Sequence, residues 1–98
     1  MARIIWSRRG ADDLESICSH IELDSDHYAR IVARRILEVV ESIVDSPEAG
    51  SIVPEYDDAE VRERFVHRYR IIYRITGSNV EIVMIRHSSR LLPDRVPE

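Results

Sequence analysis

The stretch YRIIYRITGSNVEIVMIRH, residues 69–87, decides the fold of this 98-residue chain. In residues 69–76 a tyrosine or an isoleucine occupies every second position, and this period of two is typical of a β-strand. The Gly-Ser-Asn sequence at 77–79 predicts a hairpin turn, because Gly and Asn tolerate positive φ. Residues 80–85 are apolar at every position except Glu81, which predicts a central strand that is covered on both faces.

The segments on either side of this stretch extend the pattern. Residues 61–66 alternate in the same way, and a turn near residues 67–68 joins them to the next strand. Residues 61–87 therefore predict a three-stranded antiparallel meander. Residues 90–98 contain two prolines, which prevent a regular helix, so we expect an irregular tail.

Before the meander, apolar side chains recur at helical spacing in two segments. One helix is expected over residues 8–23, with Ser7 as its N-cap. A second helix should follow the cap candidate Ser25 and run to about Asp45. Residues 2–6 are rich in β-branched and aromatic side chains and predict a short strand.

Residues 46–60 connect the second helix to the meander. We expect this connection to lie over the surface, held down by Ile52, Val53 and Tyr56. The order strand, helix, helix, meander predicts the α+β class. We expect a single domain over residues 1–98, in which an N-terminal strand and a two-helix hairpin pack on a small antiparallel sheet.

Two helices cover only one face of such a sheet. The other face would carry Ile72 together with one of two sets, depending on register: Val83 and Ile85, or Val80, Ile82 and Met84. Leaving about three large aliphatic side chains exposed forgoes ~1.5–3 kcal/mol of burial for each. We therefore expect a binding partner on this face, or a cover formed by Leu91 and Leu92 of the tail.

The charges are unevenly distributed along the chain. All 14 basic residues are arginines, and the formal net charge is −4. Residues 10–60 hold three arginines against 14 acidic residues, whereas residues 61–95 hold eight arginines against three acidic residues. A basic last third suits a nucleic acid or another charged partner.

The strongest cluster of candidate binding residues comes from this basic third: Arg62, Arg64, Arg70, Arg74, Arg86 and Arg90, interleaved with Tyr69, Tyr73 and His87. Arginine binds carboxylates and phosphates in a bidentate manner, so an acidic protein and RNA both remain open as ligands. Leu91 and Leu92 lie between two arginines and could dock on a partner by burial.

Other kinds of site have little support. The four histidines are spread over separate elements, and the three glycines form no phosphate-binding loop, so we expect neither a metal nor a cofactor. The single cysteine, Cys18, lies on an apolar helical stripe and reads as an inert core residue. One cysteine also favours a reducing, cytoplasmic setting. No apolar run reaches the ~18–20 residues of a membrane helix.

Several segments together resemble one known family. They are Trp6-Ser7, Ala11-Asp12-Asp13-Leu14, Ser46-Pro47-Glu48-Ala49-Gly50, Tyr69-Arg70-Ile71-Ile72-Tyr73 and Val80-Glu81-Ile82-Val83-Met84-Ile85-Arg86-His87. Their order and spacing resemble the ParE/RelE toxin superfamily of bacterial type II toxin–antitoxin systems. The resemblance covers about residues 2–92. It implies a small toxin that a cognate ParD-like antitoxin holds inactive in a hetero-oligomer.

The resemblance also implies a choice between two activities. RelE-like members cut mRNA with basic residues and a Tyr or His for acid–base chemistry, whereas ParE-like members lack that set and inhibit DNA gyrase. Here the corresponding positions fall near Ser88 and Ser89, and serine alone is no general base near neutral pH. The chain also has no lysine. We therefore expect a ParE-like gyrase inhibitor without catalytic residues. The alternative is a RelE-like ribonuclease that uses Arg62, Arg64, Arg70, Arg86 and His87.

Overall fold

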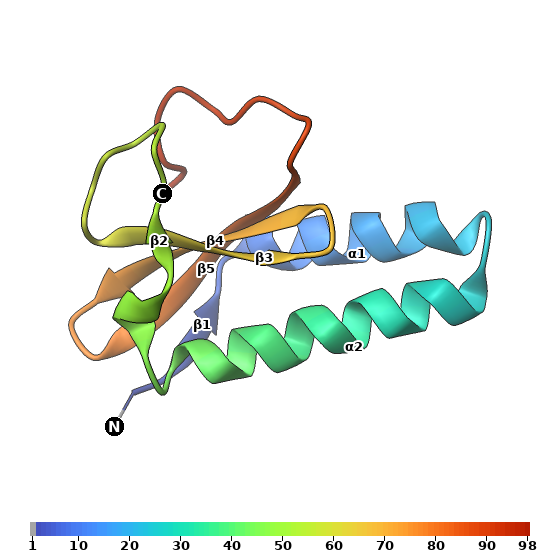
Figure 1. Cartoon of the computed structure of the whole chain (residues 1–98), viewed down its shortest axis with the longest axis horizontal. Helices are drawn as coiled ribbons and strands as arrows, with labels where there is room; N and C mark the ends of the chain where they lie inside the picture. Colours follow the sequence, from blue (N-terminus) through green and yellow to red (C-terminus); the bar gives the residue numbers. More distant parts are fainter. Residues whose placement is uncertain (1) are drawn as a thin grey trace.

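The computed structural model describes residues 2–98 and places two helices against one face of a five-stranded sheet (Figure 1). The elements are β1 (Ile4–Trp6), α1 (Arg8–Glu22), α2 (Asp26–Ile43), a 3-10 helix (Pro47–Ala49), β2 (Ser51–Ile52), β3 (Val61–Val66), β4 (Tyr69–Thr76) and β5 (Asn79–His87). The strand order is β1-β5-β4-β3-β2. The predicted α+β fold is confirmed. The sheet is mixed, because β1 pairs parallel to β5 while the other pairs are antiparallel.

The connection between α2 and β3 is more regular than expected. It contains the 3-10 helix and the two-residue strand β2, which pairs with β3. Arg62 holds it in place, because its guanidinium donates hydrogen bonds to the carbonyls of Glu48, Gly50 and Ala59, each at 3.0 Å. The loop that sequence periodicity leaves undefined is thus ordered by one arginine of the sheet.

Helix α1 completes the edge of β5 where the short strand β1 ends. The N-cap predicted at Ser7 is confirmed: its hydroxyl accepts a hydrogen bond from the Gly10 amide at 2.9 Å and donates one to the Val83 carbonyl at 2.9 Å. One turn later, the Asp13 carboxylate accepts a hydrogen bond from the Ile85 amide at 2.9 Å. These side chains satisfy backbone groups that a longer first strand would otherwise pair.

A β-bulge in β5 decides which side chains face the helices. Ile72 of β4 pairs with Met84 and Tyr73 pairs with Ile82, so Val83 is an extra residue. Val83 and Met84 therefore both join the core on the face away from the helices. The helix-side core takes the remaining aliphatic residues of β5: Val80, Ile82 and Ile85. Neither of the two registers expected from the sequence is correct, since the bulge breaks the alternation.

The face away from the helices, called here the far face, is covered by the chain itself. Its core consists of Val53, Val61, Ile72, Val83 and Met84, with Tyr56, Leu92 and Val96 packed against it. In Figure 1 the loop after β2 and the C-terminal tail both arch over the side of the sheet opposite α2. The expected exposed apolar face is therefore wrong: Val53, Tyr56 and Leu92 close it. Ile52, at 39% exposure, does not contribute.

Three side chains bind the tail through its backbone carbonyls. The Tyr56 hydroxyl donates to the Pro93 carbonyl at 2.8 Å, and the Arg74 guanidinium donates to the Pro97 carbonyl at 3.0 Å. The Arg86 guanidinium donates twice to the Leu91 carbonyl, at 3.2 and 2.9 Å. The tail has no regular structure, as predicted, yet these bonds hold it over the far face.

A buried ion cluster anchors the loop that carries Tyr56. Arg70 on β4 is 8% exposed; its Nε donates to Glu63 of β3 at 2.6 Å. Its two terminal nitrogens donate to the Glu55 carboxylate at 2.7 and 2.8 Å. Hydrogen bonding to Arg70 outweighs burial and lowers the pKa of Glu55 from 4.5 to about 2. The cluster therefore joins β3, β4 and the loop.

The two leucines of the tail provide a matched test of this closure. Leu92 packs on the far-face core, whereas Leu91 is 88% exposed. Replacing Leu92 by Ala should lower the free energy of unfolding by about 1–2 kcal/mol, because a partly buried side chain is lost. Leu91→Ala should change it by less than about 0.5 kcal/mol. Urea unfolding measures both, and equal effects would show that the tail does not pack as described.

Acid should weaken the Glu55–Arg70 pair. Since the pKa of Glu55 is lowered in the folded state, the pair stabilises the fold above pH 4.5, and this contribution is lost as the pH falls toward 2. The Glu55 side chain is 45% exposed, so solvent screening keeps the effect modest. The unfolding free energy of the wild type should fall more steeply between pH 5 and pH 2 than that of Glu55→Gln.

Asp57→Asn provides the control for this measurement. It removes one exposed carboxylate from the same loop, and none of the ion pairs among residues 2–98 involves Asp57. Its stability curve should keep the wild-type dependence on pH. Parallel curves for the wild type and Glu55→Gln would mean that this pair does not hold the loop.

Candidate functional site

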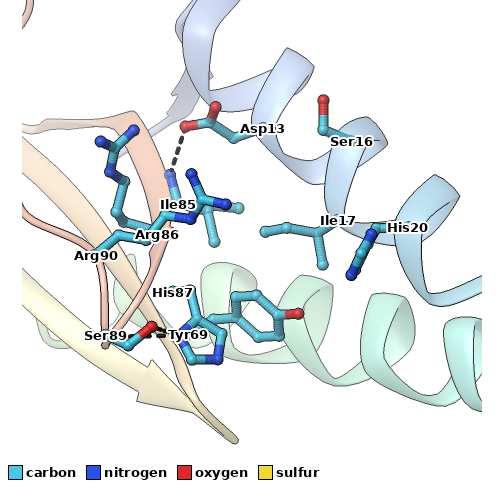
Figure 2. A pocket seen from close by; sticks show the side chains of 10 residues that line it. All are labelled: Asp13, Ser16, Ile17, His20, Tyr69, Ile85, Arg86, His87, Ser89 and Arg90. Carbon is cyan, nitrogen blue, oxygen red and sulfur yellow. Dashed lines mark hydrogen bonds between the residues drawn. The ribbon is translucent and has the colours of Figure 1, made fainter.

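The principal hollow of the surface lies where α1, the ends of β4 and β5, and the start of the tail meet. It is an open pocket of about 480 Å³. Figure 2 shows its lining: Asp13, Ser16, Ile17, His20, Tyr69, Ile85, Arg86, His87, Ser89 and Arg90. A second hollow of about 390 Å³ shares Tyr69 and His87 with it and adds Ile21, Tyr28, His67 and Arg68. The two together are called the end groove.

Aromatic contacts build the floor of the end groove. The rings of Tyr69 and His87 meet edge to face, with centroids 5.4 Å apart and an interplanar angle of 86°. Tyr28 at the start of α2 meets His67 with centroids 6.2 Å apart. His67 lies in the β3–β4 turn at φ 53°, a left-handed conformation in which His is more frequent than most side chains. The turn thus brings the sheet to the helical hairpin.

The imidazole of His87 is held by Ser89. Its Nδ1 accepts a hydrogen bond from the Ser89 amide at 3.1 Å and lies 2.7 Å from the Ser89 hydroxyl (Figure 2). Because a backbone amide can only donate, the bonding pattern assigns Nδ1 as an acceptor. In the neutral ring the proton is then on Nε2. The ring therefore offers a donor, and no free lone pair, at Nε2.

The other titratable groups near the end groove are held in their neutral forms. Burial, together with the nearby Tyr28 and Cys18, raises the pKa of the Tyr69 hydroxyl. Burial and then the charge of Glu22 raise the pKa of the Cys18 thiol. Neither group supplies an anionic nucleophile near neutral pH, so the groove is equipped for binding rather than for nucleophilic chemistry.

The six arginines proposed from the sequence do not form one surface. Arg62 and Arg64 pair with Tyr73 and Ile71 in the register and lie on the helix side of the sheet. Arg70, Arg74 and Arg86 lie on or near the far face, where they bind Glu55, Glu63, Glu81 and tail carbonyls. Arg90 lines the end groove. The fold therefore uses Arg62, Arg70, Arg74 and Arg86 as internal ties.

The alternative catalytic set is also divided. Arg86 and His87 line the end groove, but Arg70 is buried in its ion cluster. The tail residues separate as well, with Leu92 packed and Leu91 exposed. Within residues 2–98 no three His, Cys, Asp or Glu side chains are grouped so as to hold a metal ion. Nor does that part of the chain contain a helix with the length and apolarity needed to cross a membrane.

Sequence reasoning missed the residues that bring the groove together. Tyr28, His67 and Arg68 come from α2 and the β3–β4 turn, which meet only in the folded chain. Asp13 was assigned to the start of a helix, yet it bonds to Ile85 of β5. Periodicity reports which face of an element is apolar and contains no information about such long-range pairs. The surplus of arginine after residue 61 was the one available signal.

Comparisons with known proteins agree with this fold. The family model described as the ParE toxin of the type II toxin–antitoxin system parDE matches residues 4–92. The chain is 34% identical over 92 residues to the protein named Toxin RelE2 of Caulobacter vibrioides, covering 93% of this chain and 100% of that relative.

A solved structure shares the architecture. The structure titled as the chromosomal ParDE TA system from P. aeruginosa superimposes with a TM-score of 0.74 at 23% identity, over 89% of this chain and 96% of that one. At this identity the likeness shows the fold alone. The family model, by contrast, spans nearly the whole chain. This protein therefore belongs to the ParE family of toxins from type II toxin–antitoxin systems.

Proposed function

We propose that this toxin arrests growth by binding DNA gyrase and that it does not cut mRNA. The observation that carries the proposal is the hydrogen bonding of His87 to Ser89, which leaves the proton on Nε2. A general base needs an unprotonated atom within reach of the substrate hydroxyl. Moving the proton to Nδ1 would break the bond from the Ser89 amide, so this histidine is poorly placed to act as a base.

The remaining parts of a ribonuclease site give the same indication. Arg70 donates three hydrogen bonds to Glu55 and Glu63, so it has little capacity left for a phosphate. Arg86 donates twice to the Leu91 carbonyl. Ser88 and Ser89 stand where acid–base side chains would be needed. A toxin that inhibits by binding requires none of these groups.

We also propose that a ParD-like antitoxin neutralises the toxin in a hetero-oligomer, in the cytoplasm. Two observations support this partner. The matching family is described by the parDE system, and the similar solved structure carries ParDE in its title. A specific complex should bury at least ~1,000 Å² in total.

A ribosome-dependent mRNA endonuclease is the second candidate. The 34% identical relative is named RelE2, a name that favours this activity. In that case Arg86 would hold a phosphate and His87 would supply acid–base chemistry in the end groove. The two candidates differ in target and in their dependence on His87.

Induced expression separates the two candidates. With gyrase as the target, purified toxin should lower the rate of DNA supercoiling by gyrase, and cleaved DNA complexes should accumulate in induced cells. His87→Ala should keep this inhibition within about twofold, because no proton transfer is involved. Supercoiling assays and primer extension on ribosome-bound transcripts measure the two activities in parallel.

Co-expression of the antitoxin is the control, and it should abolish the effect on gyrase. Codon-specific cuts in mRNA that disappear in His87→Ala, with gyrase unaffected, would overturn the proposal and establish the endonuclease.

A further inference from the structure

The end groove carries an excess of positive charge that the fold does not use. Its lining contains Arg68, Arg86 and Arg90, against the single carboxylate of Asp13. That carboxylate already accepts the Ile85 amide, and it lies 4.0 Å from Arg9. None of the ion pairs among residues 2–98 involves Arg68 or Arg90. Two guanidinium groups therefore remain available at the rim.

The groove also offers an apolar and aromatic floor. Ile17, Ile21 and Tyr69 line it, and Tyr28 stands at its margin with 46% exposure. Tyr and Arg are enriched in the energetic centres of protein interfaces, where an aromatic contact and a charge-assisted hydrogen bond act together. A segment with an aliphatic anchor and flanking carboxylates matches both features.

The same observations favour a protein ligand over a nucleic acid. The chain has a net charge of −4 and a pI near 5.5, whereas nucleic-acid-binding domains are usually basic. Single-stranded nucleic acids bind by stacking bases on aromatic faces. Here Tyr69 and His87 turn edge to face, so each ring already covers part of the other.

We propose that the end groove receives an acidic segment of the antitoxin, with Arg68 and Arg90 binding its carboxylates and the Ile17–Tyr69 floor burying an aliphatic side chain. This inference rests on the proposed function and specifies the surface involved. The far face is not available for the same role, because the loop and tail already close it.

Charge reversal at the rim tests the proposal. The double variant Arg68→Glu/Arg90→Glu should weaken antitoxin binding about 30-fold or more, because two attractions become repulsions. Titration calorimetry at 50 and 300 mM NaCl measures the affinity. The wild type should lose affinity with salt, and the variant should lose less. Arg68→Lys/Arg90→Lys should restore most of the binding, and thermal unfolding verifies that each variant is folded.

Arg30→Glu/Arg34→Glu is the matched control. It makes the same charge change on the exposed face of α2, away from the end groove. We expect this pair to change the affinity by less than about threefold, since only long-range electrostatics is altered. Equal losses from both pairs would show that the antitoxin senses overall charge, which would overturn the proposal.

Two further outcomes distinguish the inference from the proposed function. If the antitoxin binds the Arg68→Glu/Arg90→Glu variant as tightly as the wild type, the antitoxin stands but the end groove is not its site. If the wild type binds no antitoxin, the proposed partner itself is wrong. A single-stranded RNA oligonucleotide that binds the wild type and loses affinity in this variant, while antitoxin binding is unchanged, would assign the groove to RNA instead.

Discussion

The closed far face depends on one interaction, the buried guanidinium of Arg70 between Glu63 and Glu55. It joins two neighbouring strands to the loop after β2, and that loop carries Tyr56 to the carbonyl of Pro93. The tail in turn lays Leu92 and Val96 on the far-face core. Removing one partner of a buried ion pair costs about 3–5 kcal/mol, because a charge is left uncompensated. The cluster therefore controls a larger region than its own three side chains.

Closure of the far face has a direct consequence for function. Four of the six arginines that mark the chain as a basic binding protein are engaged in internal bonds, through carboxylates or backbone carbonyls. A partner that approaches the far face would have to displace the tail and compete with those bonds. The end groove needs no such rearrangement, because Arg68 and Arg90 are already at its rim. For this reason the account places the partner there.

Much of the architecture follows from local sequence, and the exceptions have physical reasons. Ser7 and Ser25 cap both helices as expected, and the alternation of residues 61–76 gives the correct faces for β3 and β4. The bulge at Val83 could not be foreseen, because a run of apolar residues shows no alternation from which a register could be deduced. The internal use of the arginines was also hidden. It depends on carbonyls and carboxylates that the loop and tail deliver only after folding.

Hydrogen–deuterium exchange of the free toxin and of its complex with the antitoxin tests the central claim most directly. If the far face is closed by the chain's own loop and tail, antitoxin binding should slow amide exchange in the end-groove segments 17–21, 67–69 and 87–90. Segments 53–56 and 92–96 should exchange as they do in the free protein. New protection of those two segments, with none in the end groove, would contradict the account and place the antitoxin on the far face.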